Sequence, residues 1–179
     1  VLTDSARGKG SQNYYKLCSN NVGGQTDQAT GLQSLDSDGF TFGNPDDESN
    51  GDVNKNYVAW NFRAAPKFFD IQTYSGDGVA GKKVSHNLNS DVGMIITKAL
   101  SGTLANTSWY CYHKEIGSDG NMRLDKSDAI YLGPSTMWDS TDPTSSEFTL
   151  GPAGQSVNES GTDYVAYLFA DEPGLIKCG

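Results

Sequence analysis

The sequence predicts an all-β fold, an antiparallel β-sandwich or jelly-roll-like arrangement with an internal duplication, and three observations lead to this prediction. Short apolar segments alternate with polar residues at a period of two, as half-buried strands do. Glycine, asparagine, aspartate, serine and proline separate these segments at short intervals, which is typical of turns between many short strands. One phrase is written twice, as "NYVAWNF" from Asn56 to Phe62 and as "DYVAYLF" from Asp163 to Phe169.

The two copies of this phrase are the first predicted strands. Val58, Trp60 and Phe62 fall on one face of a strand in the first copy, and the second copy carries valine, tyrosine and phenylalanine at the same positions. We expect both faces to lie in a hydrophobic core.

The remaining predicted strands follow from the same pattern of short apolar runs between turn residues. In chain order they are Phe68 to Tyr74, Val84 to Leu88, Gly93 to Thr97, Trp109 to His113, Ile130 to Leu132 and Phe148 to Leu150. One helical pattern competes, because Ile96, Leu100 and Leu104 recur every four residues. Gly102 interrupts this pattern, so we expect one turn of helix at most.

The duplication extends beyond the strand phrase. "DGFTFG" from Asp38 to Gly43 corresponds to "SEFTLG" from Ser146 to Gly151, and the order of the phrases is kept while the loops between them differ in length. Such a pattern is typical of a repeated unit with variable surface loops. We therefore predict that residues 1–67 are the C-terminal part of a preceding repeat unit. Residues 68–179 are predicted to be one complete unit with the start of a following connection.

The composition excludes some classes of partner. With 22 acidic and 13 basic residues among 179, the net charge is -9, which argues against binding to nucleic acid or to an anionic membrane. No apolar segment approaches the ~20 residues that span a bilayer, so we expect no membrane insertion. The three cysteines, Cys18, Cys111 and Cys178, are odd in number and widely spaced, which predicts free thiols.

The segment "GDGVAGKK", from Gly76 to Lys83, matches parts of two phosphate-binding motifs. Its three glycines spell G-x-G-x-x-G, and Lys82 follows them as the lysine of a P-loop does. However, Lys83 stands where a P-loop needs serine or threonine, and the following "KVSHNL" alternates like a strand instead of opening a helix. We expect a glycine-rich connection between strands and no nucleotide cofactor.

Acidic loops and histidines are the remaining candidates for metal binding or catalysis. Carboxylates gather at Asp36 and Asp38 and in the loop Asp46 to Glu48, but no calcium-loop spacing is present, so we expect solvated side chains and no metal. His86 and His113 are the only histidines, and no nucleophile motif accompanies them. We predict no catalytic residue. A pair of carboxylates for glycoside cleavage is set by geometry in space, which leaves that alternative open.

Aromatic side chains give the candidate ligand contacts. Trp109, Tyr110 and Tyr112 lie in one predicted strand, and Trp138 follows in a loop. Such rings either fill the core of a sandwich or stack against sugar rings. As a carbohydrate site, these four residues would hold their rings in solvent.

Longer phrases of the sequence resemble a known family. "DSARG", "LDSDGFTFG", the run from Asn56 to Leu88, "DPTSSEFTLG" and "DYVAYLFADEPG" together resemble an uncharacterised, often repeated domain of large tail-fibre and other structural proteins of marine and environmental bacteriophages. The run from Tyr57 to Gly81 is the most specific part of the resemblance. The stretch from Gly117 to Asp139 matches only loosely.

The resemblance implies a non-enzymatic structural protein located in the virion. The first expectation is a tail-fibre segment that acts as a spacer or in host adsorption. Its expected partners are other virion proteins, further copies of itself, for example in a trimer, and a host surface polysaccharide. The alternatives are a carbohydrate-binding module that recognises the host receptor, a capsid-decorating protein and a glycan-cleaving enzyme. The enzyme would need two carboxylates roughly 5 to 9.5 Å apart across a cleft.

Overall fold

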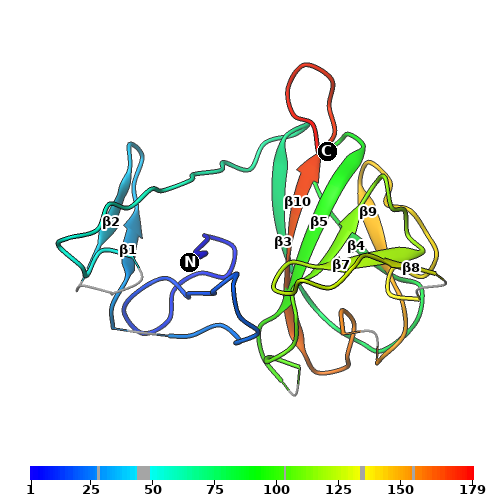
Figure 1. The fold of residues 1–179 in the computed structure, drawn as a ribbon, viewed down its shortest axis with the longest axis horizontal. Helices are drawn as coiled ribbons and strands as arrows, with labels where there is room; N and C mark the ends of the chain where they lie inside the picture. Colours follow the sequence, from blue (N-terminus) through cyan, green and yellow to red (C-terminus); the bar gives the residue numbers. More distant parts are fainter. Residues whose placement is uncertain (28, 44–48, 103, 134–135, 155) are drawn as a thin grey trace. The chain divides into compact units, whose positions relative to one another are not determined.

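The computed structural model describes residues 1–27, 29–43, 49–102, 104–133, 136–154 and 156–179. These residues contain ten β-strands and no α-helix, so the all-β prediction is confirmed (Figure 1). Every ladder between the strands is antiparallel. Within the described ranges, no helix has the length and apolar character that a membrane crossing requires.

The chain divides into two compact units. Unit 1 comprises Val1–Ser19 and Gln25–Asn61, and unit 2 comprises Asn20–Gly24 and Phe62–Gly179. In unit 1, β1 (Leu32–Leu35) and β2 (Phe40–Phe42) form a hairpin. Sequence reasoning marked the segment of β2 as a repeated phrase and did not predict β1.

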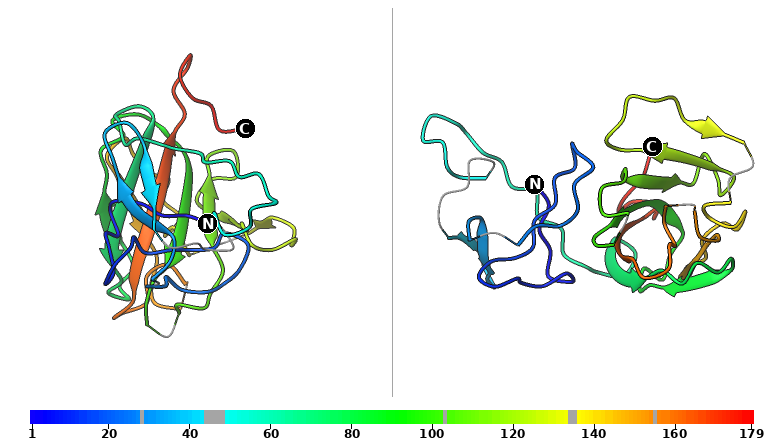
Figure 2. Two further views of the ribbon diagram at one scale, coloured as in Figure 1. Left: turned by 90° about the vertical axis from the view of Figure 1, so that its left-hand side faces the viewer. Right: turned by 90° about the horizontal axis from the view of Figure 1, so that it is seen from below.

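Unit 2 contains a six-stranded antiparallel sheet and a separate two-stranded ladder (Figures 1 and 2). In spatial order, the sheet consists of β3 (Phe69–Ser75), β10 (Asp163–Ala170), β5 (Val92–Ala99), β6 (Tyr110–His113), β7 (Gly120–Arg123) and β8 (Tyr131–Leu132). The ladder pairs β4 (Lys82–Ser85) with β9 (Glu147–Leu150). Each strand predicted after residue 67 overlaps one of these strands, and β7 is the one that sequence reasoning did not include.

The core lies where the two layers of unit 2 meet. Ile95 of β5 and Leu168 of β10 belong to the same buried cluster as Val84 of β4 and Phe148 of β9. The β4–β9 ladder therefore packs on one face of the six-stranded sheet, which is a sandwich-like arrangement. Full burial of a side chain such as Leu168 contributes roughly 1.5–3 kcal/mol.

The two copies of the strand phrase have different structures. The second copy is β10, in which Val165 is 0% and Tyr167 is 6% exposed. The first copy was predicted to be a core strand, and this prediction is wrong: residues 55–64 carry no strand assignment, and Val58 and Trp60 are 80% and 77% exposed. The physical reason is that a strand needs neighbours to pair with, and no ladder among the described residues includes this segment.

The turn that follows each copy is the same in both places. Ala65 donates its N–H to the carbonyl of Phe69 at 2.9 Å and accepts the N–H of Phe69 at 3.2 Å. Glu172 and Ile176 stand at the same positions relative to the second copy, and they exchange the same two hydrogen bonds at 2.9 and 3.1 Å. The duplication in the sequence is therefore accompanied by a duplicated local structure.

Backbone conformation repeats in these turns as well. Pro66 and Pro173 occupy the second position of each turn, and the next residues, Lys67 and Gly174, have φ of 65° and 80°. A positive φ is unusual for a lysine side chain, so Lys67 adopts the conformation that Gly174 adopts without strain. The turn closes identically although its sequence changes from "AAPKFF" to "DEPGLI".

The glycine-rich segment and the possible helical turn near Leu100 both have the structures that the sequence predicted. The glycine-rich segment before Lys82 connects β3 to β4, Gly78 and Gly81 have φ of 75° and 82°, and a strand follows instead of a helix. Ile96 lies in β5, and no helical turn forms in the described residues around Leu100.

Candidate functional site

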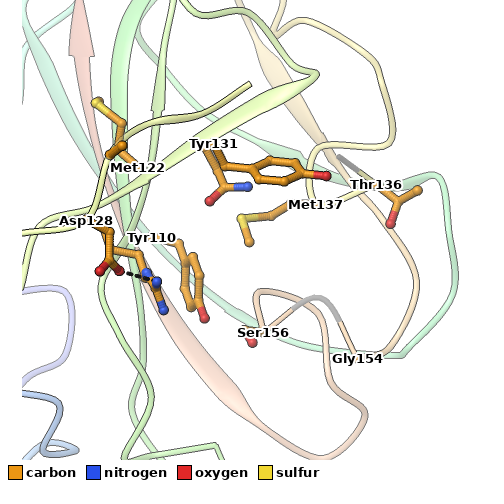
Figure 3. A pocket seen from close by; sticks show the side chains of 11 residues that line it. Tyr110, Met122, Asp128, Tyr131, Thr136, Met137, Gly154 and Ser156 are labelled. Atoms are coloured by element: carbon orange, nitrogen blue, oxygen red, sulfur yellow. Dashed lines mark hydrogen bonds and ion pairs between the residues drawn. The ribbon is translucent and has the colours of Figure 1, made fainter. Parts of the chain in front are cut away.

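A pocket of about 450 Å³ in unit 2 is the candidate site. It lies beside the far edge of the sheet, because Tyr110 of β6 pairs with Arg123 of β7, and Asn121 of β7 pairs with Tyr131 of β8. These pairings bring side chains from three neighbouring strands to one place. Figure 3 shows them with Met137 projecting between the rings of Tyr110 and Tyr131.

The charged part of this pocket is an ion pair. Arg123 donates from a guanidinium nitrogen to the carboxylate of Asp128, and their side chains are 40% and 50% exposed (Figure 3). A pair this open to solvent contributes about 0–1 kcal/mol to stability. Its polar atoms are thus available to bind a ligand without a large loss of folding energy.

The aromatic part consists of Tyr110 and Tyr131. Tyr131 is 52% exposed, whereas Met137 beneath it is 5% exposed. The exposed ring of Tyr131 and the partly buried ring of Tyr110 lie next to a guanidinium, a carboxylate and the amide of Asn121. They combine an apolar face with hydrogen-bond donors and acceptors. This combination suits a polyhydroxylated ring better than an apolar ligand.

The same lining offers little for hydrolysis. Asp128 is the one carboxylate among the described lining residues, and it is already paired with Arg123. Glycoside hydrolysis uses two carboxylates that flank the scissile bond. The described lining contains neither a second carboxylate nor a histidine or cysteine.

The structure places the four predicted carbohydrate-contact residues differently from one another. Tyr110 lines the pocket. Trp109, Tyr112 and Trp138 are 0%, 4% and 1% exposed, so the prediction that their rings lie in solvent is wrong for these three. Both faces of the sheet are covered at β6, and an alternating pattern therefore does not reveal which aromatic side chains are exposed.

Local contacts fix each of the three buried rings. The indole nitrogen of Trp109 donates to the carbonyl of Asn21 at 3.1 Å, and its ring stacks on Tyr167. Tyr112 and Trp138 meet edge to face with ring centroids 6.0 Å apart. Burial, followed by the nearby carboxylate of Asp142, raises the pKa of Tyr112. These rings stabilise the core.

Sequence reasoning missed Arg123, Asp128 and Tyr131 as ligand contacts. Tyr131 lay in a predicted strand, but its exposure results from the edge position of β8, which only the strand order reveals.

The histidines and acidic loops are engaged locally. The Nδ1 atom of His86 accepts the N–H of Leu88 at 3.3 Å, and burial lowers the pKa of His86. The Nδ1 atom of His113 accepts the N–H of Glu115 at 3.2 Å.

Asp36 accepts hydrogen bonds from Ser34 and Thr41. The loop Asp46 to Glu48 lies outside the described residues. Among the residues that are described, no three histidine, cysteine or acidic side chains gather as metal ligands would.

All three cysteines are free thiols, as expected. Burial raises the pKa of Cys111 to about 12 and also raises that of Cys178. Because the thiolate is the reactive form, neither buried thiol is suited to nucleophilic chemistry near neutral pH.

A buried lysine lies on the other face of the sheet. Lys98 is 1% exposed and donates from Nζ to the carbonyls of Ala99 and Ala105 at 3.0 and 2.7 Å. Burial lowers the pKa of Lys98 to about 8, and the nearby carboxylate of Asp125 partly opposes this shift. The two carbonyls hold the amine in place, so its function is structural.

Replacing Lys98 with methionine is expected to change how stability depends on pH. The pKa of Lys98 is about 8 in the folded chain and 10.5 as its ordinary value, so the unfolded state binds more protons between these pH values. The free energy of unfolding of the natural chain, minus that of Lys98→Met, should therefore rise from pH 8 towards pH 10, by at most about 1.4 kcal/mol per pH unit. Urea unfolding of both chains at several pH values measures this difference. A difference that stays constant with pH would contradict the assignment.

A protein-family model described as "Domain of unknown function (DUF7483)" matches residues 1–179, the whole of both units. No curated protein and no solved structure matches the chain.

Proposed function

The chain belongs to the family of the domain of unknown function DUF7483, and we propose that it is a non-enzymatic, repeat-built segment of a phage tail fibre. The observation that carries this proposal is the duplicated turn. The chain leaves the first strand phrase through the turn closed by Ala65 and Phe69, and it leaves β10 through the same turn closed by Glu172 and Ile176.

The same connection follows both copies of the strand phrase. The first turn leads directly into β3, and residues after the second turn stand at the sequence positions of β3. In repeat proteins, units of one kind stack on their neighbours along one direction, and such an array grows in length by a constant step. Such growth suits a fibre better than it suits a capsid-decorating protein, which covers a closed shell.

The proposal includes the partners and the location expected from the sequence. The chain functions in the virion, next to other virion proteins and further copies of itself in a trimer. Symmetric association gives a thin fibre stiffness, and it multiplies any weak contact with the host surface.

Adding units to the chain tests the fibre proposal. The separation between Gln72 and Gly179 equals the separation between Asn56 and Asp163, so residues 73–179 make up one repeat period. This segment can be appended to the chain once, twice or three times. Electron microscopy of these polypeptides should show rods that lengthen by the same step with each added unit, and light scattering should show three copies per particle. In a matched polypeptide, a glycine-serine linker of equal length replaces residues 172–176 at every junction, and it should lose straightness. Flexible beads whose separation grows as the square root of their number would contradict the proposal.

A second candidate function, recognition of a host surface polysaccharide, is favoured by the composition of the pocket. Tyr110, Tyr131 and the Arg123–Asp128 pair present an aromatic face beside charged hydrogen-bonding groups. Eight of the lining residues lie between Gly117 and Asp139, a stretch that matches the resembled phage domain only loosely.

Replacing Tyr131 with alanine is expected to lower the affinity for host polysaccharide about 10-fold or more, because a ring stacked on a sugar contributes on the order of 1.5 kcal/mol. Adsorption of labelled chain to isolated polysaccharide measures the change. Leu175→Ala serves as the control, since Leu175 is 58% exposed and lies outside the pocket. Equal binding by the natural chain and Tyr131→Ala would contradict this site. Release of reducing ends in the same sample would contradict the non-enzymatic proposal.

A further inference from the structure

Residues 56–62 form an apolar segment whose counterpart is buried. Val58 and Trp60 are 80% and 77% exposed, whereas Val165 and Tyr167 at the same positions of β10 are 0% and 6% exposed. Single exposed apolar residues are common, but a valine and a tryptophan on one side of a strand phrase are not scattered. The chain thus contains two copies of a similar segment, one buried in a sheet and one exposed to solvent.

The buried copy, β10, shows which neighbouring strands enclose such a segment. β10 lies between β3 and β5 and pairs with both along its length. Val165 pairs with Thr73 of β3 on one side and with Lys98 of β5 on the other. Backbone groups on both edges of β10 therefore find partners, and its side chains are enclosed from both neighbours.

The described part of the chain has one pair of strands of this type, and β10 already occupies the space between them. Unit 1 contains a counterpart of β9, the segment of β2, which pairs with β1 instead of with a strand like β4. Among the described residues, the first copy therefore has no pair of strands of this type to enclose it.

We propose that residues 56–62 are a docking strand that inserts between two antiparallel strands of the β3 and β5 type from an adjoining repeat unit. The second copy specifies the binding partner of this strand. The partner is a segment with the sequence pattern of residues 68–107, whose two long strands leave an open position between them. The inference stands on the repeat and on the exposure of Val58 and Trp60, and it does not depend on the proposed fibre function.

The two copies differ at three positions, and at one of them a polar residue stands in place of a core residue. Asn61 stands where Leu168 is 0% exposed and belongs to the core cluster. The other face of the phrase keeps its apolar character, with Val58, Trp60 and Phe62. Asn61→Leu should therefore strengthen docking, because it adds apolar contact at the face that packs on the second layer.

A fusion of the chain with its own first half-unit tests the inference. A duplicate of residues 68–107, placed directly before Val1, gives Asn56 the same spacing from the added strands that Asp163 has from β3 and β5. Exchange of the amide hydrogens of residues 56–62 should slow about 100-fold or more relative to the natural chain, as protection in a ladder requires. The duplicate contains no tryptophan, and Trp109 and Trp138 are buried, so loss of acrylamide quenching would report on Trp60 directly.

Val58→Asp provides the matched control. In the fusion it would bury a charge at the position of Val165 and should restore fast exchange, whereas in the natural chain it should leave exchange unchanged. Unchanged exchange and quenching of residues 56–62 in the fusion would overturn the inference. Protection that survives Val58→Asp would overturn it too. So would protection of the natural chain that rises with protein concentration, because a second copy would then cover the segment.

Discussion

Replacing Gly151 with alanine is expected to lower the free energy of unfolding by about 4 kcal/mol or to prevent folding, because overpacking of this severity exceeds the usual 1–3 kcal/mol. A Cβ atom at Gly151 would lie 1.5 Å from the carbonyl oxygen of Thr136. The obstacle is backbone, so no side chain can rotate to make room. Urea unfolding followed by circular dichroism measures the loss.

The surroundings of Gly151 prevent a backbone shift as well. Its N–H donates to the carbonyl of Met137 at 2.9 Å, and its own carbonyl accepts the side-chain amide of Asn158 at 2.7 Å. Gly39→Ala is the control, since nothing lies within 4 Å of a Cβ atom at that position, and it should change stability by less than about 1 kcal/mol. Equal stability of Gly151→Ala and Gly39→Ala would show that the contact with Thr136 is wrong.

Replacing Trp138 with alanine is expected to cost about 3–5 kcal/mol, the usual range for a buried tryptophan. Trp138 is 1% exposed and contacts the rings of Tyr112 and Phe148 at centroid distances of 6.0 and 6.5 Å. Its removal opens a cavity between the sheet and the β4–β9 ladder. Thermal and urea unfolding of the variant measure the cost.

Trp60→Ala makes the same chemical change at an exposed position. Because Trp60 is 77% exposed, its loss should alter stability by no more than about 0.5 kcal/mol. Comparing the two variants distinguishes the stability lost through core packing from any effect of removing a large side chain at the surface. Similar losses for the two variants would contradict the burial of one and the exposure of the other.

Sequence reasoning predicted most of the strands of unit 2, because alternation and turn residues are local signals. It could not distinguish "NYVAWNF" from "DYVAYLF", since strand formation depends on neighbours that the phrase itself does not contain. The second copy pairs with β3 and β5, and the first has no such pair among the described residues. The prediction at Val58 and Trp60 was therefore wrong because neighbouring strands are missing, and not because the segment has a low β-propensity.

The candidate site was less accessible to sequence reasoning. Tyr110 was identified, while Tyr131 and the Arg123–Asp128 pair become visible only when β6, β7 and β8 lie side by side. Trp138 could not be assigned to the core, because the loop that contains it has no periodicity.

The most direct measurement of the central proposal is to locate the chain in virus particles from the cells that express it. Quantitative mass spectrometry of purified particles should find the chain in a fixed ratio to the other virion proteins. Gold-labelled antibody against the chain should mark the fibres and leave the heads unlabelled. Absence of the chain from intact particles, with soluble chain left in the lysate, would contradict a role as a tail-fibre segment.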